Sequence, residues 1–520
     1  MGGIGMKCFL GIDSGTSGIK AVVVGETGQM LGVGYKEISL ITPQPLWVEQ
    51  DPEEWWDAAV YAIKQAVAKS GCGRDILAIG LTGQMLGSTL LDGHGRSLGN
   101  CMIWLDQRAT EERDYIENTA GMDKLLDITA NYPLTGYWAP KLMWLKKNRP
   151  EVFEKVGTVL FPKDYLRYRL TGELSVEVSD ASGSYLFDVQ GRGWSDEMFE
   201  LCGLPEGIVP RKVYESPEIA GYLLKSLAGE LGLTAGIPVV GGGGDQTAGG
   251  VGNGIVREGV VSATIGTSGV VFACTDKVLK DKLGRAAMSF CHSVPGKWCF
   301  FGCTLAAGGS FKWLRDNFFA REKETYAKEG KDVYELMTSM AGKAPASSEG
   351  LVFLPYLNGE RTPYPDPNAR GVFFGLSYRH GLNEICRSVM EGVTFSLRDT
   401  IEILKEFGIG VNEVRASGGG AKSAFWRQLQ ADIYNAAVIT TNVEEGPSVG
   451  AAILAAVGSG HFGSVQEACD SIVKVVSRTE PDPKRVELYD DFYITYRELY
   501  AKLKDTFAVQ SQKVLKWMKA

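Results

Sequence analysis

The chain has 520 residues, of which 44% are hydrophobic and 22% charged, as expected for a globular protein of more than one domain. Its formal net charge of −8 argues against a nucleic-acid-binding protein, which usually carries a basic patch. The sequence shows no signal-peptide-like start and no uninterrupted apolar run of ~18 residues, so we predict a cytoplasmic protein without a membrane partner. The ten cysteines and four histidines show no metal-ligand spacing.

The first glycine-rich segment is Asp13-Ser14-Gly15-Thr16-Ser17-Gly18, which lies between the apolar runs 8–10 and 19–24. Turn residues between two strand-like runs predict a hairpin. Its small side chains leave backbone N–H groups open to phosphate oxygens, and the carboxylate of Asp13 at the strand end can hold a hydrated Mg²⁺. Taken alone, the segment fits a plain hairpin without a ligand at least as well.

A helix is predicted at 53–69, where Asp51 and Pro52 supply an N-cap and a first-turn proline and apolar residues recur with a helical period. Four more helices are predicted in the second half of the chain: 382–407 with Asn383 as its N-cap, 423–435, 448–457 and the amphipathic stretch 486–519. Strands that alternate with helices indicate an α/β protein.

Four glycines at 241–244 follow a strand-like run and precede Asp245 and Gln246 at the start of a helix. Glycines let a ligand approach the backbone closely, and a carboxylate beside that ligand can act as the general base of a phosphoryl transfer. Gln246 can bind the acceptor hydroxyl next to it. The alternatives are a plain N-cap aspartate and a dinucleotide-binding turn, but the second lacks the G-x-G-x-x-G arrangement with an acidic residue about 20 positions later.

The tetrapeptide Gly-Thr-Ser-Gly occurs twice, at 15–18 and at 266–269, each time between two apolar runs. The copies lie about half a chain apart, which is too far for a solenoid repeat and predicts two similar domains that each open with a hairpin. Two such hairpins across a cleft could clamp a triphosphate, although no Walker-type G-x-x-x-x-G-K-[ST] segment occurs. A further glycine turn at 417–423 follows a strand and could support an adenosine, or be a plain strand-to-helix turn.

Taken in order, these motifs resemble the FGGY carbohydrate kinases, and within that family the xylulokinase group. The resemblance spans residues 7–475 and extends beyond the glycine turns to these segments: Leu46-Trp47-Val48-Glu49-Gln50-Asp51-Pro52, Gly83-Gln84-Met85, Phe161-Pro162-Lys163-Asp164-Tyr165-Leu166, Gly359-Glu360-Arg361-Thr362-Pro363 and Gly371-Val372-Phe373-Phe374-Gly375-Leu376. It implies an α/β protein of two actin-like (ribonuclease H-like) ATPase domains with an interdomain cleft. The expected divisions are a sugar-binding domain at 6–254, a nucleotide-binding domain at 255–480 and a helical extension at 481–520.

The resemblance also implies ATP-dependent phosphorylation of a small ketose, most closely D-xylulose to D-xylulose 5-phosphate, with ATP and Mg²⁺ as cofactors. A homodimer stays open. Asp245 matches the family's catalytic base, and Asp13 would lie near the metal. The matching nucleotide positions are Thr16, Ser17, Gly266, Thr267, Gly308, Lys312, Gly419 and Ser423. The matching sugar positions are Met85, Leu86, Trp104, Asp106, Asp245 and Gln246.

Three positions depart from the xylulokinase pattern. Leu86 stands where that group usually has histidine, Leu105 where it often has asparagine, and Trp138 where it usually has a small residue or proline. If these side chains line the pocket, a lost hydrogen bond would cost about 1–3 kcal/mol, and the acceptor would differ from D-xylulose. Kinases for ribulose, fuculose, tetrulose or tetritol, and glycerol stay open, as do an actin- or Hsp70-like ATPase and a catalytically inactive sugar sensor.

Overall fold

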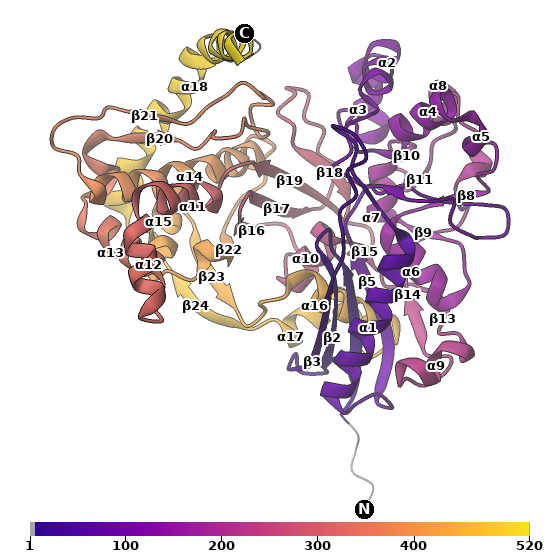
Figure 1. The fold of residues 1–520 in the computed structure, drawn as a ribbon. Coiled ribbons are helices and arrows are strands. Elements are labelled where there is room, and N and C mark those ends of the chain that lie inside the picture. The colour runs from indigo at the N-terminus through magenta and orange to yellow at the C-terminus, as the bar shows by residue number, and fades with distance from the viewer. Residues whose placement is uncertain (1–5, 519–520) are drawn as a thin grey trace, which may run out of the picture.

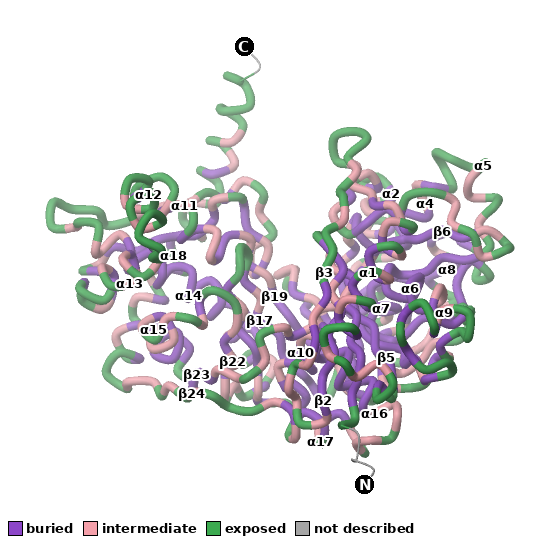
Figure 2. The backbone as a smooth tube through the Cα atoms, turned by 60° about the horizontal axis from the view of Figure 1, so that its bottom comes forward, coloured by how far each residue is buried: buried purple, intermediate pink, exposed green. Residues whose placement is uncertain are grey.

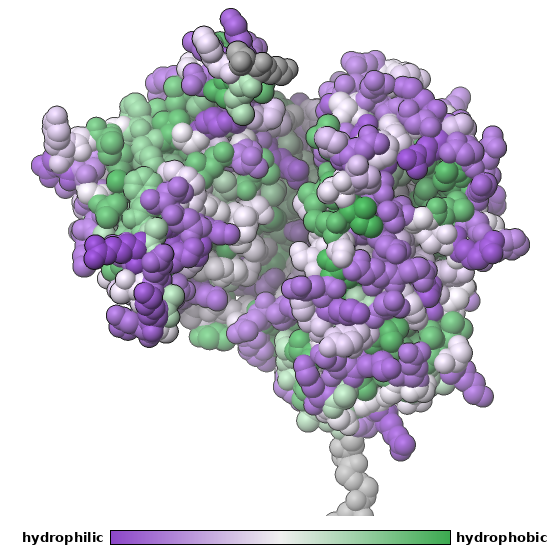
Figure 3. All heavy atoms as spheres, in the orientation of Figure 1, coloured by the Kyte–Doolittle hydropathy of each residue, from purple (hydrophilic) through white to green (hydrophobic). Residues whose placement is uncertain are grey.

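A computed structural model of the protein describes residues 6–518. Figure 1 shows two lobes, each built on a β-sheet with helices beside it. The N-terminal half forms one lobe and most of the C-terminal half forms the other. Figure 3 shows a deep groove between the two lobes at the end of the molecule where the C-terminus lies.

The first sheet has the strand order β13-β14-β5-β1-β2-β3, with β15 beside β5. Strands β1, β2 and β3 are antiparallel neighbours, whereas β5 and β14 run parallel to β1. The bounds are β1 (Cys8–Ser14), β2 (Gly18–Gly25), β3 (Met30–Glu37), β5 (Ile76–Gly83), β13 (Ile219–Tyr222), β14 (Pro238–Val240) and β15 (Gly243–Gly244).

The second sheet has the order β18-β19-β17-β16-β22-β23-β24. Its strands β16, β17 and β19 are antiparallel neighbours, and β22 and β23 run parallel to β16. The bounds are β16 (Val260–Ile265), β17 (Gly269–Thr275), β18 (Met288–Cys291), β19 (Trp298–Thr304), β22 (Glu413–Gly418), β23 (Ala437–Thr441) and β24 (Val475–Thr479).

The two sheets repeat one pattern. The order β3-β2-β1-β5-β14-β13 in the first sheet corresponds to β19-β17-β16-β22-β23-β24 in the second, and each ends on an antiparallel edge strand. In both sheets a Gly-Thr-Ser-Gly turn joins the first two strands of the pattern, β1 to β2 and β16 to β17. The pair of similar α/β units predicted from the repeated turn is thus confirmed.

Helices cover the sheets and link their strands. In the first half they are α1 (Pro52–Ser70), α2 (Thr110–Ala120), α3 (Met122–Thr129), α4 (Trp138–Asn148), α5 (Pro150–Phe153), α6 (Pro162–Thr171), α7 (Val178–Ala181), α8 (Asp196–Cys202), α9 (Lys225–Leu231) and α10 (Asp245–Gly252). In the second half they are α11 (Gly308–Phe318), α12 (Ala320–Lys328), α13 (Val333–Lys343), α14 (Leu382–Glu406), α15 (Ala424–Tyr434), α16 (Gly446–Gly458), α17 (Val465–Ile472) and α18 (Pro483–Met518).

Short strand pairs complete the fold outside the two sheets. They are β4 (Glu49–Gln50), β6 (Thr89–Leu91), β7 (Cys101–Met102), β8 (Thr158–Leu160), β9 (Val176–Glu177), β10 (Phe187–Asp188), β11 (Gly193–Trp194), β12 (Val213–Tyr214), β20 (Val352–Leu354) and β21 (Val372–Phe374).

Helix α16 comes late in the chain but packs on the first sheet, where Figure 1 shows it beside β2 and β5. Glycines make this close approach feasible. A Cβ atom at Gly11 in β1 would overlap the carbonyl oxygen of Ser448, and one at Gly80 in β5 would overlap that of Ala451. The chain therefore returns to the first lobe after building the second sheet, which ties the two lobes together.

The helix ends follow local sequence signals. Asp51 caps α1 by accepting a hydrogen bond from the Glu53 amide, as predicted, and Ser423 caps α15. The expected N-cap of α14 at Asn383 is wrong. Gly381 occupies that position. The Glu384 carboxylate, in the first turn of α14, accepts a hydrogen bond from the Gly381 amide and so gives this N-cap amide a partner.

Figure 2 shows that buried residues concentrate in the two sheets and in the helices that contact them. The C-terminal helix α18 begins packed on the second lobe, and its last turns project from the body of the molecule (Figure 1). Lys519, included in the predicted helix, lies outside the described residues. Within residues 6–518, no helix combines the length and apolarity needed to cross a membrane.

Candidate active site

Two aspartates, Asp13 and Asp245, meet at one end of the first sheet. Strands β1 and β15 flank β5, and both Ser14 and Gly244 pair with Gly83 of that central strand. Asp13 immediately precedes Ser14, and Asp245 immediately follows Gly244. The parallel register therefore brings the two carboxylates to the same edge of the sheet, as expected for strands whose carboxyl ends coincide.

Burial shifts the acidity of both carboxylates. It raises the pKa of Asp13 to about 7, with a further increase from the nearby Asp245 and a partial offset from Lys20. Burial also raises the pKa of Asp245 to about 6, although hydrogen bonds from the backbone and side chain of Gln246 lower it in part. A carboxylate with such a pKa suits proton acceptance near neutral pH.

The donor set at Asp13 fits a magnesium ion. Its Oδ1 atom is buried and has no hydrogen-bond partner among residues 6–518. The described part of the chain contains no group of three or more His, Cys, Asp or Glu side chains arranged to cage a metal. Magnesium is commonly held by one or two carboxylates together with waters and nucleotide phosphates, so a single orphaned carboxylate oxygen is sufficient here.

A chain of hydrogen bonds joins the first hairpin to the predicted sugar site. The indole Nε1 of Trp104 donates to Oγ1 of Thr16 at 2.9 Å, and Thr16 Oγ1 donates to Oε1 of Gln84 at 3.4 Å. The buried Gln50 donates from Nε2 to the Thr16 carbonyl at 2.8 Å and accepts from Gln84 Nε2 at 2.6 Å. These amides fix the hairpin, and Trp104 remains 37% exposed beside it.

Met85 and Leu86 follow Gln84 at the end of β5. Met85 packs against the glycine loop, because a Cβ at Gly244 would lie 2.7 Å from its side chain. Leu86 adopts a left-handed backbone conformation (φ 72°), and its carbonyl accepts a hydrogen bond of 2.9 Å from the buried Nζ of Lys141. The structure therefore brings Met85 directly beside the Asp245 loop, with Leu86 next to it.

Trp138 does not enter the open site. Its ring is fully buried, stacks on Phe161 with a centroid separation of 3.7 Å, and donates a 2.7 Å hydrogen bond to the Gly87 carbonyl. It supports the chain after Leu86 from the core side. Trp138 therefore fills the first core and does not line an open pocket.

Asp106 is also engaged by the protein itself. Its carboxylate is fully buried, accepts from the Val48 amide at 2.8 Å and forms a 2.6 Å ion pair with Arg108. The Arg108 guanidinium in turn lies over the Trp47 ring at 3.8 Å. This geometry favours a supporting role for Asp106, which holds the segment of Trp104 in place, over direct contact with a ligand.

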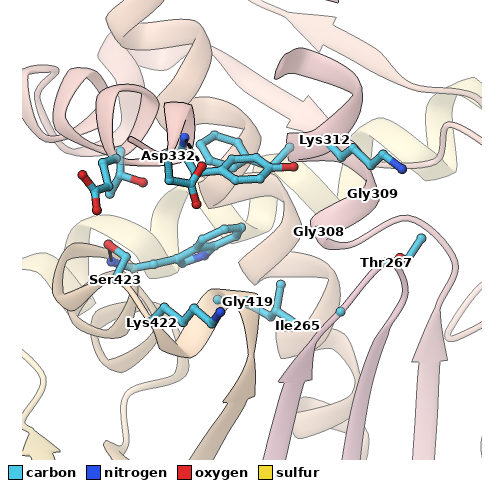
Figure 4. A pocket seen from close by; sticks show the side chains of 16 residues that line it. Ile265, Thr267, Gly308, Gly309, Lys312, Asp332, Gly419, Lys422 and Ser423 are labelled. Atoms are coloured by element: carbon cyan, nitrogen blue, oxygen red, sulfur yellow. Dashed lines mark hydrogen bonds between the residues drawn. The ribbon is translucent and has the colours of Figure 1, made fainter. Parts of the chain in front are cut away.

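A cavity of about 650 Å³ opens in the second lobe between β16, α11, α13 and the turn after β22. Its lining includes every residue that the sequence assigns to the nucleotide site in this half of the chain: Gly266, Thr267, Gly308, Lys312, Gly419 and Ser423. Figure 4 shows Lys312 and Lys422 on opposite walls. Thr16 and Ser17 lie outside this cavity, on the hairpin of the first lobe, where the Ser17 side chain is exposed.

Backbone contacts hold the second hairpin against the start of α11. The amides of Gly308 and Gly309 donate to the carbonyls of Gly266 and Thr267 at 2.8 and 2.9 Å. A Cβ at Gly308 would overlap the Gly266 oxygen. These two amides therefore fix the hairpin against the helix N-terminus, with Gly266 and Thr267 on the wall of the cavity.

Sequence reasoning missed one wall of the cavity. Helix α13 contributes Asp332, Tyr334, Glu335 and Thr338, and the aromatic residues Phe311 and Trp426 complete the lining. These residues lie in ordinary amphipathic helices, which carry no local signal for a ligand. Only the packing of α13 beside α11 and α15 reveals them.

The comparisons with known proteins agree with this architecture. The model of the N-terminal domain of the FGGY family of carbohydrate kinases matches residues 8–252, and that of the C-terminal domain matches residues 261–459. The chain belongs to the FGGY family of carbohydrate kinases, with the actin-like ATPase fold of that family.

Curated relatives and solved structures cover nearly the whole chain. The xylulose kinase of Escherichia coli (strain K12) is 39% identical over 496 residues, 95% of this chain and 99% of the relative. That of Bacillus subtilis (strain 168) is 36% identical, covering 96% and 98%. The crystal structure of xylulose kinase from Rhodospirillum rubrum aligns with a TM-score of 0.88 at 28% identity, covering 96% and 100%.

Proposed function

We propose that the protein transfers the γ-phosphoryl group of ATP to a hydroxyl of D-xylulose, giving ADP and D-xylulose 5-phosphate. The single observation that carries this proposal is the pairing of a half-buried aspartate of raised pKa, Asp245, with full-length similarity to curated xylulose kinases. The nucleotide would occupy the 650 Å³ cavity of the second lobe, and the sugar would lie beside Trp104 in the first.

Asp245 would act as the general base. Its carboxylate accepts the proton of the attacking hydroxyl as the oxygen bonds to phosphorus and the bond to the ADP oxygen breaks. Gln246 would hold the hydroxyl beside it, since its side chain already lies next to Asp245. Ionised Asp245 is required, and its pKa of about 6 supplies that form at neutral pH.

Backbone groups would hold the phosphates. The turn at Gly266 and Thr267 would place its backbone beside the phosphates, and the first turn of α11, whose Gly308 and Gly309 amides donate to that turn, would hold it there. Lys312 and Lys422 would add positive charge. Thr16 and Ser17 would contribute from the opposite hairpin. Asp13 would hold Mg²⁺, whose charge would neutralise the phosphate oxygens when it is bound.

The two lobes would close over the substrates. Closure brings the acceptor hydroxyl in line with the γ-phosphate and excludes water, which limits wasteful hydrolysis of ATP. The ion pair of Lys20 and Glu445, at 2.6 Å, lies where the chain comes back from the second lobe and α16 begins on the first sheet. We infer that this side of the groove is the hinge.

The identity of the acceptor sugar needs a direct test, because Leu86 and Leu105 replace polar residues of the xylulokinase pattern. We would follow ADP release against ketoses and polyols of three to seven carbons and compare kcat/KM. D-xylulose should give the highest value. A higher value for ribulose, fuculose, a tetrulose or tetritol, or glycerol would reassign the acceptor, and no turnover with any of them would favour an inactive sugar sensor.

A further inference from the structure

The loop before the proposed base has no side chains of its own. Residues 241–244 are all glycine, and each of them is closely confined by its neighbours. A Cβ at Gly242 would overlap the Leu81 carbonyl, and one at Gly243 would overlap the Ser293 hydroxyl. A glycine loop is intrinsically pliable, so whatever fixes the direction of Asp245 must come from outside the loop.

Besides the pairing of β15 with β5 and a 2.8 Å bond from the Gly241 amide to the Glu218 carbonyl, three hydrogen bonds anchor this loop. They run from Arg167 Nη1 to the Gly241 carbonyl at 2.6 Å, from the Gly242 amide to the Ser216 carbonyl at 2.9 Å, and from the Gly244 amide to Ser179 Oγ at 3.0 Å. The Ser179 hydroxyl also lies 3.1 Å from Oγ1 of Thr247 in the first turn of α10. Ser179 therefore contacts the chain on both sides of Asp245.

Ser179 is itself oriented by Glu177. The Glu177 carboxylate accepts from Ser179 Oγ at 2.6 Å and from the Ser179 amide at 2.9 Å. The hydroxyl proton is thereby committed to Glu177, which leaves the Oγ lone pair directed at the Gly244 amide. Glu177 also accepts from Ser216 Oγ at 3.0 Å, so it orients two of the residues that bind the loop, Ser179 and Ser216.

Glu177 belongs to a fully buried cluster of charges. Lys163 Nζ contacts three carboxylates, those of Asp164 at 2.6 Å, Asp180 at 3.0 Å and Glu177 at 3.3 Å. Arg167 joins the cluster through a 2.8 Å ion pair with Asp164. Buried ion pairs often add little stability compared with apolar packing. Fixing geometry is a better-supported use for this cluster, because Arg167 binds the loop directly and Glu177 binds it through Ser179.

We propose that Ser179, oriented by Glu177, is a positioning residue that sets the direction of the Asp245 carboxylate. This inference rests on the proposed role of Asp245 as the base. The sequence alone assigns the Lys163 segment no role. In the structure Lys163 contacts Glu177, Glu177 accepts from Ser179, and Ser179 accepts from the Gly244 amide.

The test compares Ser179→Ala with Ser184→Ala. Ser184 is an equally buried serine that donates to the Ala181 carbonyl at 2.7 Å and accepts from the Leu186 amide at 3.0 Å, without touching the loop. Displacing a catalytic base by about 1 Å can lower the rate about a hundredfold. We expect Ser179→Ala to lower kcat roughly ten- to a hundredfold with an unchanged KM for ATP. Ser184→Ala should leave both constants near wild type.

A second measurement needs no turnover and separates this inference from the proposed function. Amide hydrogen exchange in the peptide that covers 241–248 should be faster in Ser179→Ala than in wild type or Ser184→Ala. Equal exchange and an equal kcat in the two variants would overturn the positioning role. If wild-type protein phosphorylates no sugar, the proposed function fails, and the exchange comparison still decides whether Ser179 anchors the loop.

Discussion

The indole Nε1 of Trp104 donates a hydrogen bond of 2.9 Å to the hydroxyl of Thr16. Trp104 belongs to the predicted sugar site, and Thr16 belongs to the hairpin predicted to contact phosphate. This hydrogen bond therefore connects the predicted sugar site with the predicted phosphate site. Gln50 and Gln84 also hydrogen-bond to Thr16 and hold the turn in place. A change at the Trp104 indole should therefore alter the position of the Thr16 hydroxyl.

Replacing Trp104 with phenylalanine tests this link. The Trp104→Phe variant keeps an aromatic ring but loses the donor, and a net hydrogen bond is worth about 0.5–1.5 kcal/mol. We expect kcat/KM for the sugar to fall roughly three- to tenfold in steady-state assays. Trp194→Phe is the matched control, because the Trp194 Nε1 also donates one hydrogen bond, to the Pro210 carbonyl at 2.9 Å, in another part of the lobe. Equal losses in both variants would contradict the link.

Much of this site could be predicted because its signals are local. The turn at 15–18, the glycines before Asp245 and the turn at 266–269 each combine small residues with flanking strands, and the structure has hairpins or strand ends at all three. The repeat of one tetrapeptide also predicted two similar domains, and the matching strand orders of the two sheets confirm them. Such features survive in sequence because only a few residue types fit those backbone conformations.

The rest could not be predicted, because it depends on contacts between distant segments. Nothing local shows that α16 returns to the first sheet or that α13 lines the nucleotide cavity. Trp138 departs from the xylulokinase pattern in the sequence, but only the structure shows that its ring stacks on Phe161 in the core. A side chain's direction is set by packing that the sequence alone does not display.

The pH dependence of turnover should report Asp245. Burial raises its pKa to about 6, and the base must be ionised to accept a proton, so activity is lost as the pH falls through that value. We expect kcat/KM for the sugar to fall about tenfold per pH unit below pH ~6. In Asp245→Asn the residual rate should be lower by roughly 10²–10⁴ and show no such acid limb, while calorimetry still detects ATP binding. An unchanged limb in that variant would assign the titration to another group.

Asp13 should lower stability at alkaline pH. Its folded-state pKa of about 7 lies above the ordinary value of 3.8, so the protonated form stabilises the folded protein below pH ~4 and this benefit is lost as the pH rises through 7. We expect Asp13→Asn to raise the melting temperature by a few degrees at pH 8 and by less at pH 5, in scanning fluorimetry without metal. Magnesium should raise the pH 8 melting temperature of wild type and leave that of the variant unchanged. A variant that melts lower than wild type at pH 8 would contradict this reasoning.

Adding one methyl group at Gly308 should disturb the predicted phosphate-binding hairpin without disturbing the rest of the second lobe. In Gly308→Ala the new Cβ would overlap the Gly266 carbonyl oxygen and push the second hairpin away from α11. We expect the KM for ATP to rise at least roughly tenfold, since misplaced backbone donors lose charge-assisted bonds worth about 1.5–3 kcal/mol each.

Gly229→Ala is the matched control, because a Cβ there meets no atom within 4 Å and the glycine lies exposed in helix α9. That variant should keep its kinetic constants and melt at an equal or slightly higher temperature, because alanine favours helix over glycine. If Gly308→Ala binds ATP as tightly as Gly229→Ala does, the nucleotide phosphates do not rest on this hairpin.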